Sequence, residues 1–161
     1  MENIRIAQPV DDEHIGQLLI KTFSNLYAAM GVTMSTQREA YLKDQIGRRA
    51  FATTFVYEVD AKLRGTVTLV PPSPDSEAWK AGAWDLRLLA VDPDMQGKGI
   101  ARKLLQFSEK VAGSAGGTAI CLHARKGVES QAALYMACNY IRDRSGDLST
   151  EPAQEGYRKD L

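Results

Sequence analysis

One segment constrains the fold of this chain more than any other. An apolar run at Leu88–Val91 leads into an Asp92-Pro93 turn, and a short glycine-rich stretch then opens a helix. Gly97 and Gly99 at the helix entrance leave backbone N–H groups without acceptors, and the helix dipole adds partial positive charge there. The apolar stripe of the helix is Ile100, Leu104, Phe107 and Val111. The segment therefore predicts a strand, an anion-binding loop and an amphipathic helix.

Two common phosphate-binding patterns do not fit this loop. A Walker loop requires G-x-x-x-x-G-K-[ST], and both the spacing and the hydroxyl are missing here. A dinucleotide fingerprint requires a third glycine where this chain has Arg102, so the helix could not pack closely at that point. These failures disfavour a nucleotide-binding α/β protein and leave the pattern Q-x-x-G-x-A at Gln96, Gly99 and Ala101.

The remaining pattern resembles motif A of the GNAT superfamily of N-acetyltransferases, [QR]-x-x-G-x-[GA], at all three positions. A second resemblance lies at Leu134-Tyr135 and Asn139-Tyr140, where the family usually has L-Y-x-x-x-G-F. Asn replaces Gly and Tyr replaces Phe, and both changes are mild because Asn tolerates left-handed backbone. The resemblance implies an α/β (α+β) three-layer fold, in which about four helices flank a mixed central sheet of about six to seven strands.

The pattern along the chain predicts one acetyltransferase domain over residues 1–161, with the order β-α-α-β-β-β-α-β-α-β-β. Expected strands are 4–7, 54–59, 63–70, 85–91, 119–123, 140–142 and 156–160. Expected helices begin at Asp11 or Asp12, at a Thr36-x-x-Glu39 capping box that opens a helix to about Arg48, at Ile100, and at 130–138. The long segment 71–82 and residues 27–35 are expected to shape an acceptor cleft.

Composition excludes several classes of protein. The 161 residues carry 20 basic and 20 acidic side chains, so no net charge favours nucleic acid or an anionic membrane surface. The chain has 44% hydrophobic and 25% charged residues, which is ordinary for a globular protein. Cys121 and Cys138 are too few for a disulfide scaffold and are expected to be buried free thiols. No signal peptide or membrane span is apparent, so a cytoplasmic location is expected.

The resemblance also assigns the cofactor-binding residues. It implies that main-chain groups of Leu89, Ala90 and Val91 pair with the pantetheine of acetyl-CoA. Gln96 belongs to the motif, and the pyrophosphate would lie over the backbone of Gly97, Lys98, Gly99, Ile100, Ala101 and Arg102. The side chains of Lys98 and Arg102 either add charge-assisted contacts or are solvated cations. No metal is expected.

Three residues are candidates for proton transfer. Tyr135 stands at the family's general-acid position, where a phenol can protonate the departing thiolate, and the alternative is a core tyrosine. Asp85 and His123 are both candidates for the general base, because the family often has acidic residues near these positions and histidine has a suitable unperturbed pKa. The alternatives are an Asp85–Arg87 ion pair and a hydrogen-bonded histidine at the end of a strand. The family often has a cofactor-binding Asn at the position of Val128, and Ser130 is a possible substitute.

The implied activity is acetyl transfer from acetyl-CoA to a primary amine by direct attack in a ternary complex. The acceptor would be a small-molecule or protein amine, and a homodimer is compatible with this interpretation. The alternative is a non-catalytic acyl-CoA-binding sensor or partner module on the same scaffold. The presence of Tyr135 favours the enzyme, since a sensor needs no general acid.

Overall fold

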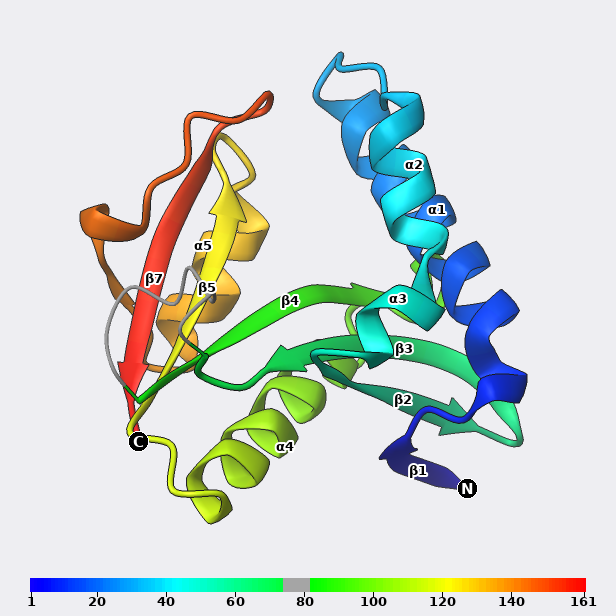
Figure 1. The fold of residues 1–161 in the computed structure, drawn as a ribbon. Helices are drawn as coiled ribbons and strands as arrows, with labels where there is room; N and C mark the ends of the chain where they lie inside the picture. Colours follow the sequence, from blue (N-terminus) through cyan, green and yellow to red (C-terminus); the bar gives the residue numbers. More distant parts are fainter. Residues whose placement is uncertain (74–81) are drawn as a thin grey trace. The chain divides into compact units, whose positions relative to one another are not determined.

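The computed structural model describes residues 1–73 and 82–161 (Figure 1). Within them, hydrogen bonding links the strands in the order β1-β2-β3-β4-β5-β7-β6. The strands are β1 (Glu2–Ile6), β2 (Thr53–Val59), β3 (Lys62–Val70), β4 (Ala83–Val91), β5 (Ala119–Arg125), β6 (Ile141–Arg142) and β7 (Gln154–Asp160). The α-helices are α1 (Asp12–Ala29), α2 (Thr36–Lys43), α3 (Gln45–Arg49), α4 (Ile100–Ser114) and α5 (Glu129–Ala137). This mixed sheet with its helices confirms the predicted fold class.

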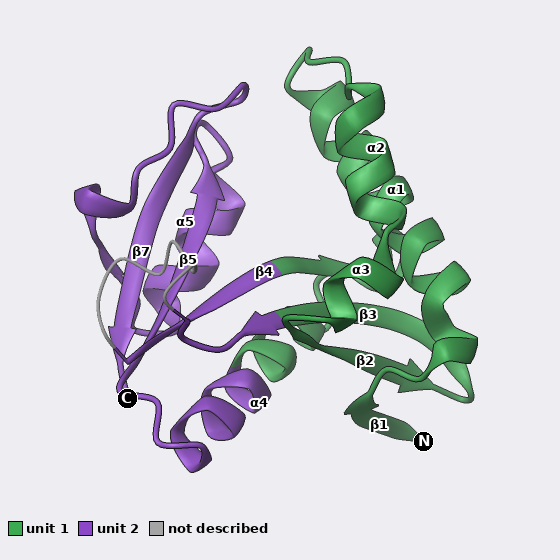
Figure 2. Ribbon diagram, viewed as in Figure 1, with its two compact units in different colours: residues 1–68, 88–105 green, residues 69–87, 106–161 purple. Residues whose placement is uncertain are grey.

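The chain divides into two compact units (Figure 2). Unit 1 comprises residues 1–68 and 88–105, and unit 2 comprises residues 69–87 and 106–161. The division falls inside β3, β4 and α4, so these three elements contribute residues to both units. Most of the acceptor loop expected at 71–82 lies outside the described residues, because the structure does not describe 74–81.

In unit 1, β1 pairs with β2 in antiparallel register, from Glu2 opposite Val59 to Ile6 opposite Phe55. Asp60 and Ala61 join β2 to β3, both with positive φ, 49° and 61°, as expected for a two-residue hairpin whose turn follows the strand twist. Figure 1 shows α1 and α2 side by side, and residues of the two helices contact each other. The buried core of this unit includes Ile15, Leu19, Phe23, Tyr27, Leu42, Val56, Leu88 and Ala90.

The predicted helix 36–48 is wrong in two respects. Asp44, with ψ of +63°, breaks it into α2 and α3, and its carboxylate accepts a hydrogen bond from the Gly47 N–H at 2.9 Å. The capping residue of α2 is Ser35 rather than Thr36, because the Ser35 hydroxyl accepts from the Arg38 N–H at 3.1 Å. Both changes satisfy backbone N–H groups that a helix start leaves without partners.

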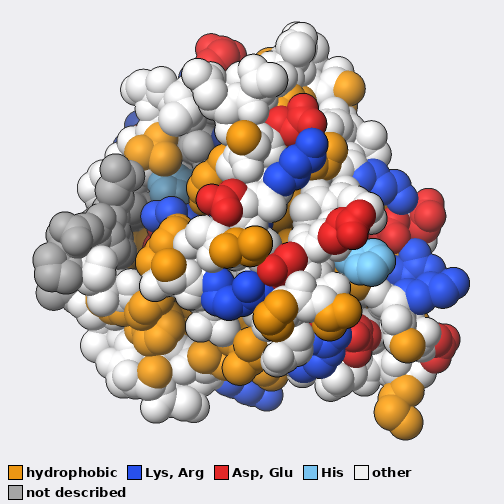
Figure 3. Space-filling model, turned by 45° about the vertical axis from the view of Figure 1, so that its right-hand side comes forward, with side chains coloured by type: hydrophobic (Ala, Val, Ile, Leu, Met, Phe, Trp, Pro, Cys, Tyr) orange, Lys and Arg blue, Asp and Glu red, His pale blue; other side chains and the backbone are white. Residues whose placement is uncertain are grey.

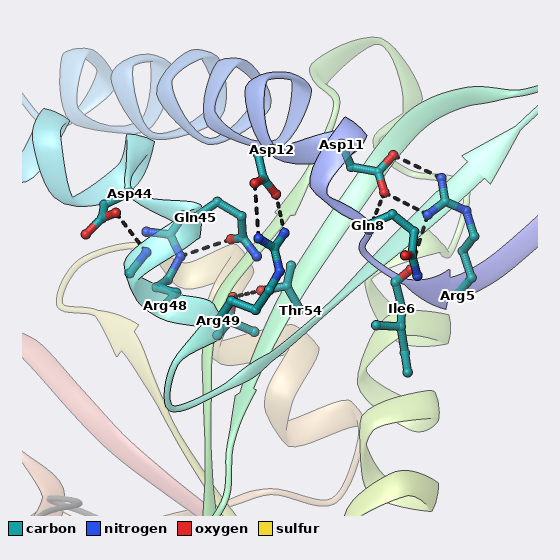
Figure 4. Close-up of polar contacts among 12 residues, drawn as sticks. Arg5, Ile6, Gln8, Asp11, Asp12, Asp44, Gln45, Arg48, Arg49 and Thr54 are labelled. Atoms are coloured by element: carbon teal, nitrogen blue, oxygen red, sulfur yellow. Dashed lines mark hydrogen bonds and ion pairs between the residues drawn. The ribbon is translucent and has the colours of Figure 1, made fainter.

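The start of α1 also differs from the expectation. The Asp11 side chain caps no N–H of α1. It accepts instead from the Gln8 N–H at 2.6 Å and from Arg5 (Figure 4). Arg5 also pairs with Glu58. These bonds hold the pKa of Asp11 below its ordinary value, chiefly through the bond from Arg5. Asp11 therefore connects the segment between β1 and α1 to Arg5 of β1 and, through Arg5, to Glu58 of β2.

In unit 2, β5 pairs with β7 and β7 with β6, both antiparallel, while β4 and β5 are parallel over three residue pairs, Ala83–Asp85 with Ala119–Cys121. Asn139 has a φ of +69°, which confirms the left-handed cap expected after α5. The strand predicted to end at His123 continues to Arg125. His123 is therefore an interior residue of β5, not the residue at its end.

Cys121 and Cys138 are buried free thiols, as predicted. On the face drawn in Figure 3, Lys and Arg side chains are interspersed with Asp and Glu side chains, in keeping with the balanced composition. No helix within residues 1–73 and 82–161 combines the length and the apolar character needed to cross a membrane.

Candidate functional site

The loop between β4 and α4 has the backbone that its glycines predict. Gly97 and Gly99 have φ of +79° and +81°, in the left-handed region that side chains rarely adopt. A Cβ built at either glycine would meet no atom within 4 Å. Glycine is therefore needed here for backbone conformation and for open space above the loop, not for packing.

The N–H groups of this loop point to an anion-binding function. Among the described residues, the backbone N–H groups from Gly97 to Arg102 have no hydrogen-bond acceptor, and the first bond of the helix is from the Lys103 N–H to the Gly99 carbonyl at 3.0 Å. Ile100 and Leu104 are buried, so the apolar face fixes the helix start against unit 1. A row of unbonded N–H groups at a fixed helix N-terminus can hold a phosphate group.

Side chains at the start of the loop hold it in place. The Asp92 carboxylate accepts from the Asp94 N–H at 3.1 Å and pairs with Arg64 at 2.8 Å and Lys21 at 3.3 Å. Burial alone would raise the pKa of Asp92, but these three donors outweigh it and lower the pKa. The Gln96 side chain donates to the Val91 carbonyl at 3.3 Å. Asp92 and Gln96 therefore hold the loop in place through hydrogen bonds with backbone groups of the protein.

The side chain of Lys98 lies within 3.8 Å of the Met95 sulfur, while Arg102 is exposed at the start of α4. Neither cation has a carboxylate partner among residues 1–73 and 82–161. Cations at a helix N-terminus oppose its dipole. Their roles at the phosphate loop stay predictions.

The backbone of β4 contains an irregularity that sequence alternation did not predict. Leu88, a buried non-glycine residue, has a φ of +54°. The regular alternation expected from Asp85 through Val91 is therefore interrupted at Leu88. Ala90 and Val91 are buried and Leu89 is half-buried. Their predicted role in pairing with pantetheine is a main-chain role and stays a prediction.

Tyr135 on α5 is packed among aromatic rings. It is 6% exposed, and its ring centroid lies 6.1 Å from that of Tyr140 and 5.9 Å from that of Tyr157. Burial raises the pKa of Tyr135 to about 12, opposed only in part by the nearby Arg125 charge. Its hydroxyl makes no hydrogen bond with a described residue. The phenol is thus protonated at neutral pH, and its position is fixed by the ring alone.

His123 has a defined proton arrangement. Its Nε2 lies 2.8 Å from the Gly146 carbonyl oxygen, which can only accept a hydrogen bond. Nε2 must therefore carry the hydrogen, and acceptance of a further proton falls to Nδ1. The residue is half-buried on β5. The role of His123 as a base stays a prediction.

Asp85 is buried near the start of β4 and accepts from Arg87 Nε at 2.6 Å. The ion pair weighed as the alternative for Asp85 is therefore present. Asp85 stands opposite Cys121 in the sheet, and its charge adds to burial, the larger cause, in raising the pKa of that thiol.

Sequence reasoning missed two features of this region. Lys21 and Arg64, which hold Asp92, lie far from it in sequence and carry no motif. At the position where the family often has Asn, Val128 precedes α5 and provides no side-chain cap. Ser130, suggested as a substitute, is exposed, while the Gln131 side chain accepts from the Arg125 N–H at 2.7 Å. The bonds of Lys21 and Arg64 to Asp92, and of Gln131 to Arg125, can be seen only in the folded structure.

Comparison with known proteins identifies the family. The sequence model of the acetyltransferase (GNAT) family matches residues 15–140. No curated protein matches the sequence.

Solved structures show the same fold at low identity. The PaiA N-acetyltransferase from Thermoplasma acidophilum, solved in complex with coenzyme A, is 16% identical, with a TM-score of 0.81 over 100% of this chain and 99% of that chain. A GNAT acetyltransferase from Staphylococcus aureus Mu50 is 14% identical, with a TM-score of 0.79 over 100% and 99%. A GNAT acetyltransferase from Brucella melitensis, solved with acetyl-CoA, is 20% identical, with a TM-score of 0.69 over 100% and 88%. With the family match over most of its length, the chain belongs to the GNAT acetyltransferase family.

Proposed function

We propose that this chain transfers the acetyl group of acetyl-CoA to a primary amine in a ternary complex. The observation that carries the proposal is the row of unbonded N–H groups from Gly97 to Arg102, in a chain that belongs to the GNAT family. The match at 15–140 includes residues of both compact units, which supports one acetyltransferase domain over 1–161. The acceptor class is a small-molecule or protein amine.

The fit of the loop to a pyrophosphate rests on its backbone. The left-handed conformations at Gly97 and Gly99 expose N–H groups, and no Cβ fills the space above them. N–H donors that form no bond within the protein lose little when they turn to a phosphate, and the dipole of α4 adds to the attraction. Gln96 and Asp92 keep the loop in this shape before a ligand binds.

The pantetheine arm would pair with the main chain of β4. The ladder between β4 and β5 comprises only Ala83–Asp85, so Leu89, Ala90 and Val91 lie beyond it. Main-chain pairing places the thioester without a specific side chain, as in the addition of a strand to a sheet edge. This supports the prediction that Leu89, Ala90 and Val91 act through their backbone.

The chemistry requires a neutral amine and a protonated leaving group. The amine nitrogen attacks the thioester carbonyl carbon, a C–N bond forms, and the C–S bond breaks as the tetrahedral intermediate collapses. We propose that Tyr135 gives its proton to the departing sulfur. With a pKa of about 12, the phenol carries its proton at neutral pH.

The proton lost by the amine goes to a base, and we propose His123 in preference to Asp85. The Gly146 carbonyl fixes the proton on Nε2, whereas Asp85 is bound to Arg87. If neither residue takes the proton, the amine loses it directly to solvent.

A thiol-release assay tests the proposed function. Purified protein is mixed with acetyl-CoA and a panel of primary amines, and free CoA thiol is followed with a thiol-reactive dye. Thiol release that depends on the amine, together with the acetylated amine by mass spectrometry, is the expected result. Binding of acetyl-CoA by calorimetry without transfer to any amine would instead identify a CoA-binding module.

A further inference from the structure

A pocket of about 460 Å³ lies in unit 1, between the first half of α1 and the hairpin that joins β2 to β3. Figure 1 shows this hairpin beside the start of α1. Asp92, where the phosphate loop begins, also lines the pocket, and all of the lining residues belong to unit 1. The volume falls within the range of about 300–1,000 Å³ that is typical of small-molecule sites. The pocket is therefore large enough for a small organic ligand.

Two of the carboxylates that line the pocket are already bonded to the protein. Arg5 of β1 donates to Asp11 at 2.7 Å, as Figure 4 shows. The same guanidinium pairs with Glu58 of β2. Asp11 also accepts from the Gln8 N–H at 2.6 Å. Because these carboxylates have donors within the protein, they give little reason to expect a cationic ligand.

The other charged groups of the pocket are mainly basic. The Asp92 carboxylate pairs with Nη1 of Arg64 at 2.8 Å and with Nζ of Lys21 at 3.3 Å. Lys62 also lines the pocket, and it forms no ion pair within residues 1–73 and 82–161. Three cations thus share one carboxylate. A guanidinium has five N–H donors and an ammonium three, so donors are left for an anion.

Apolar side chains form another part of the wall. Leu18 of α1 is buried, Leu63 of β3 is half-buried, and Ala61 lies in the turn of the hairpin. A bare inorganic ion would leave these side chains in contact with water, whereas an organic anion would cover them and gain hydrophobic free energy. The lining therefore fits a small molecule with a carboxylate or phosphate at one end and an apolar group at the other.

The cations of the pocket also act on the phosphate loop. Asp92, which Lys21 and Arg64 hold, accepts from the Asp94 N–H at 3.1 Å, and the Asp92 N–H donates to the Arg64 carbonyl at 2.8 Å. An anion bound to these cations would compete with Asp92 for their donors. It would also place negative charge beside a loop suited to phosphate groups. Both effects weaken the binding of CoA, which is itself a polyanion.

We propose that this pocket binds a small organic anion through Lys21, Lys62 and Arg64, and that the bound anion weakens CoA binding at the phosphate loop through Asp92. The coupling rests on the proposed acetyl-CoA-dependent function, whereas the anion site is independent of it. Because coupling between two binding sites is reciprocal, CoA weakens the binding of the anion by the same factor.

Chemical-shift mapping of the backbone amides by NMR tests the site. Butyrate and butyl phosphate are titrated separately at constant ionic strength, with chloride as the balancing salt and 1-butanol as the uncharged probe. At least one anion should cause saturable shifts in the hairpin Ala61–Arg64 and in the first half of α1, and the tighter anion identifies the preferred group. Shifts confined to residues 97–102, no saturable shift, or equal shifts with 1-butanol overturn the site.

Three variants locate the bound anion. Lys62→Gln should weaken its binding by about fivefold, the effect of losing one partly exposed charge. Lys43→Gln is the matched control, because Lys43 is an exposed cation of unit 1 that does not line the pocket, and it should bind the anion like the wild type. Gly99→Val alters the phosphate loop and should keep the shifts in the hairpin. Equal affinity in the two lysine variants, or loss of those shifts in Gly99→Val, overturns the site.

Calorimetry of CoA at increasing concentrations of the tighter anion separates coupling from direct competition. The Kd for CoA should rise to a plateau at least about fivefold above its value without the anion, since both ligands can bind together. A rise in direct proportion to the anion concentration, without a plateau, would show competition at the phosphate loop and overturn the coupling, as would an unchanged Kd. If CoA does not bind at all, the proposed function fails, while the shift mapping still decides the anion site.

Discussion

Gly65 of β3 lies directly beneath Leu104 of α4, so that a Cβ on Gly65 would stand 3.0 Å from Leu104 Cδ1. The same Cβ would be 3.1 Å from Ile100 Cγ2 and 3.4 Å from the Ala90 carbonyl oxygen. Ile100 and Leu104 are fully or almost fully buried and have little room to move. The absence of a side chain at Gly65 thus sets how closely the helix behind the phosphate loop approaches the sheet.

We expect Gly65→Ala to destabilise the protein by about 1–3 kcal/mol through overpacking. Urea unfolding measures this change. Gly113→Ala is the matched control, because Gly113 lies in α4 with no atom within 4 Å of an added Cβ. That control should be stabilised by about 0.5–1 kcal/mol, the usual gain for alanine over glycine in a helix. Equal stability of the two variants would contradict the close packing at Gly65.

Gly99→Val should weaken CoA binding at least about tenfold, or about 1.4 kcal/mol, because it disturbs the left-handed loop and fills the space for the pyrophosphate. Isothermal calorimetry gives the affinity. Gly116→Val introduces comparable backbone strain, since Gly116 has a φ of +83° and open space around it. Gly116 lies outside the loop, so its variant should bind CoA like the wild type. Unchanged affinity in a folded Gly99→Val protein would refute the loop assignment.

Tyr135→Phe should lower kcat by about 10²–10⁴, the usual contribution of a general acid, while acetyl-CoA binding persists. The hydroxyl makes no hydrogen bond with described residues, so its removal leaves the contacts with Tyr140 and Tyr157 in place. Stopped assays with a confirmed acceptor measure kcat, and thermal unfolding checks stability. A wild-type rate would show that Tyr135 only packs.

Tyr140→Phe provides the comparison for Tyr135→Phe. The Tyr140 hydroxyl donates to Glu109 at 3.1 Å, and Glu109 also pairs with Lys159 at 3.0 Å. Loss of that bond should cost about 1 kcal/mol of stability and leave kcat within about twofold of the wild type. Tyr135→Phe should therefore lower kcat and leave stability unchanged, whereas Tyr140→Phe should lower stability and leave kcat nearly unchanged.

The general base is tested by the pH dependence of kcat/KM. His123→Gln should lose the ascending limb near neutral pH and recover activity only at high pH, where the amine is deprotonated in solution. Asp85→Asn should keep the wild-type profile. If the two results are reversed, Asp85 is the base. If both variants retain the limb, the amine loses its proton to solvent and the enzyme acts mainly by placing the reactants together.

Asp147 should stabilise the protein in a pH-dependent way. Its carboxylate pairs with Arg142 at 2.6 Å and accepts from the Gly156 N–H at 3.0 Å, and these bonds, chiefly the first, lower its pKa from 3.8 to about 2. A lowered pKa means that the stabilisation is present above the unfolded-state value and is lost as pH falls from about 4 to about 2.

We expect Asp147→Asn to cost about 1 kcal/mol at pH 7, a value reduced for the partial exposure of the side chain. The difference from the wild type should shrink as the pH falls below 4 and vanish near 2. Unfolding in urea at several pH values measures it. A difference that stays constant with pH would assign the effect to packing instead of charge.

Local sequence rules determined a large part of this protein. The conformation of Gly97 and Gly99 and the left-handed Asn139 follow from the backbone preferences of single residues. The strand and helix order follows from apolar periodicity. The same local pattern at Gln96, Gly99 and Ala101 identified the family, because a phosphate loop is built from consecutive residues.

Only the tertiary structure decided the contacts between distant segments. Leu88 adopts positive φ inside a strand, although nothing in the apolar run marks it. Arg64 and Lys21 meet at Asp92, and Arg38 stacks on Phe23, across separations that carry no periodic signal. Each depends on which side chains the fold brings within a few ångströms. Ion pairs and cation–π contacts depend on that distance, which local preferences do not encode.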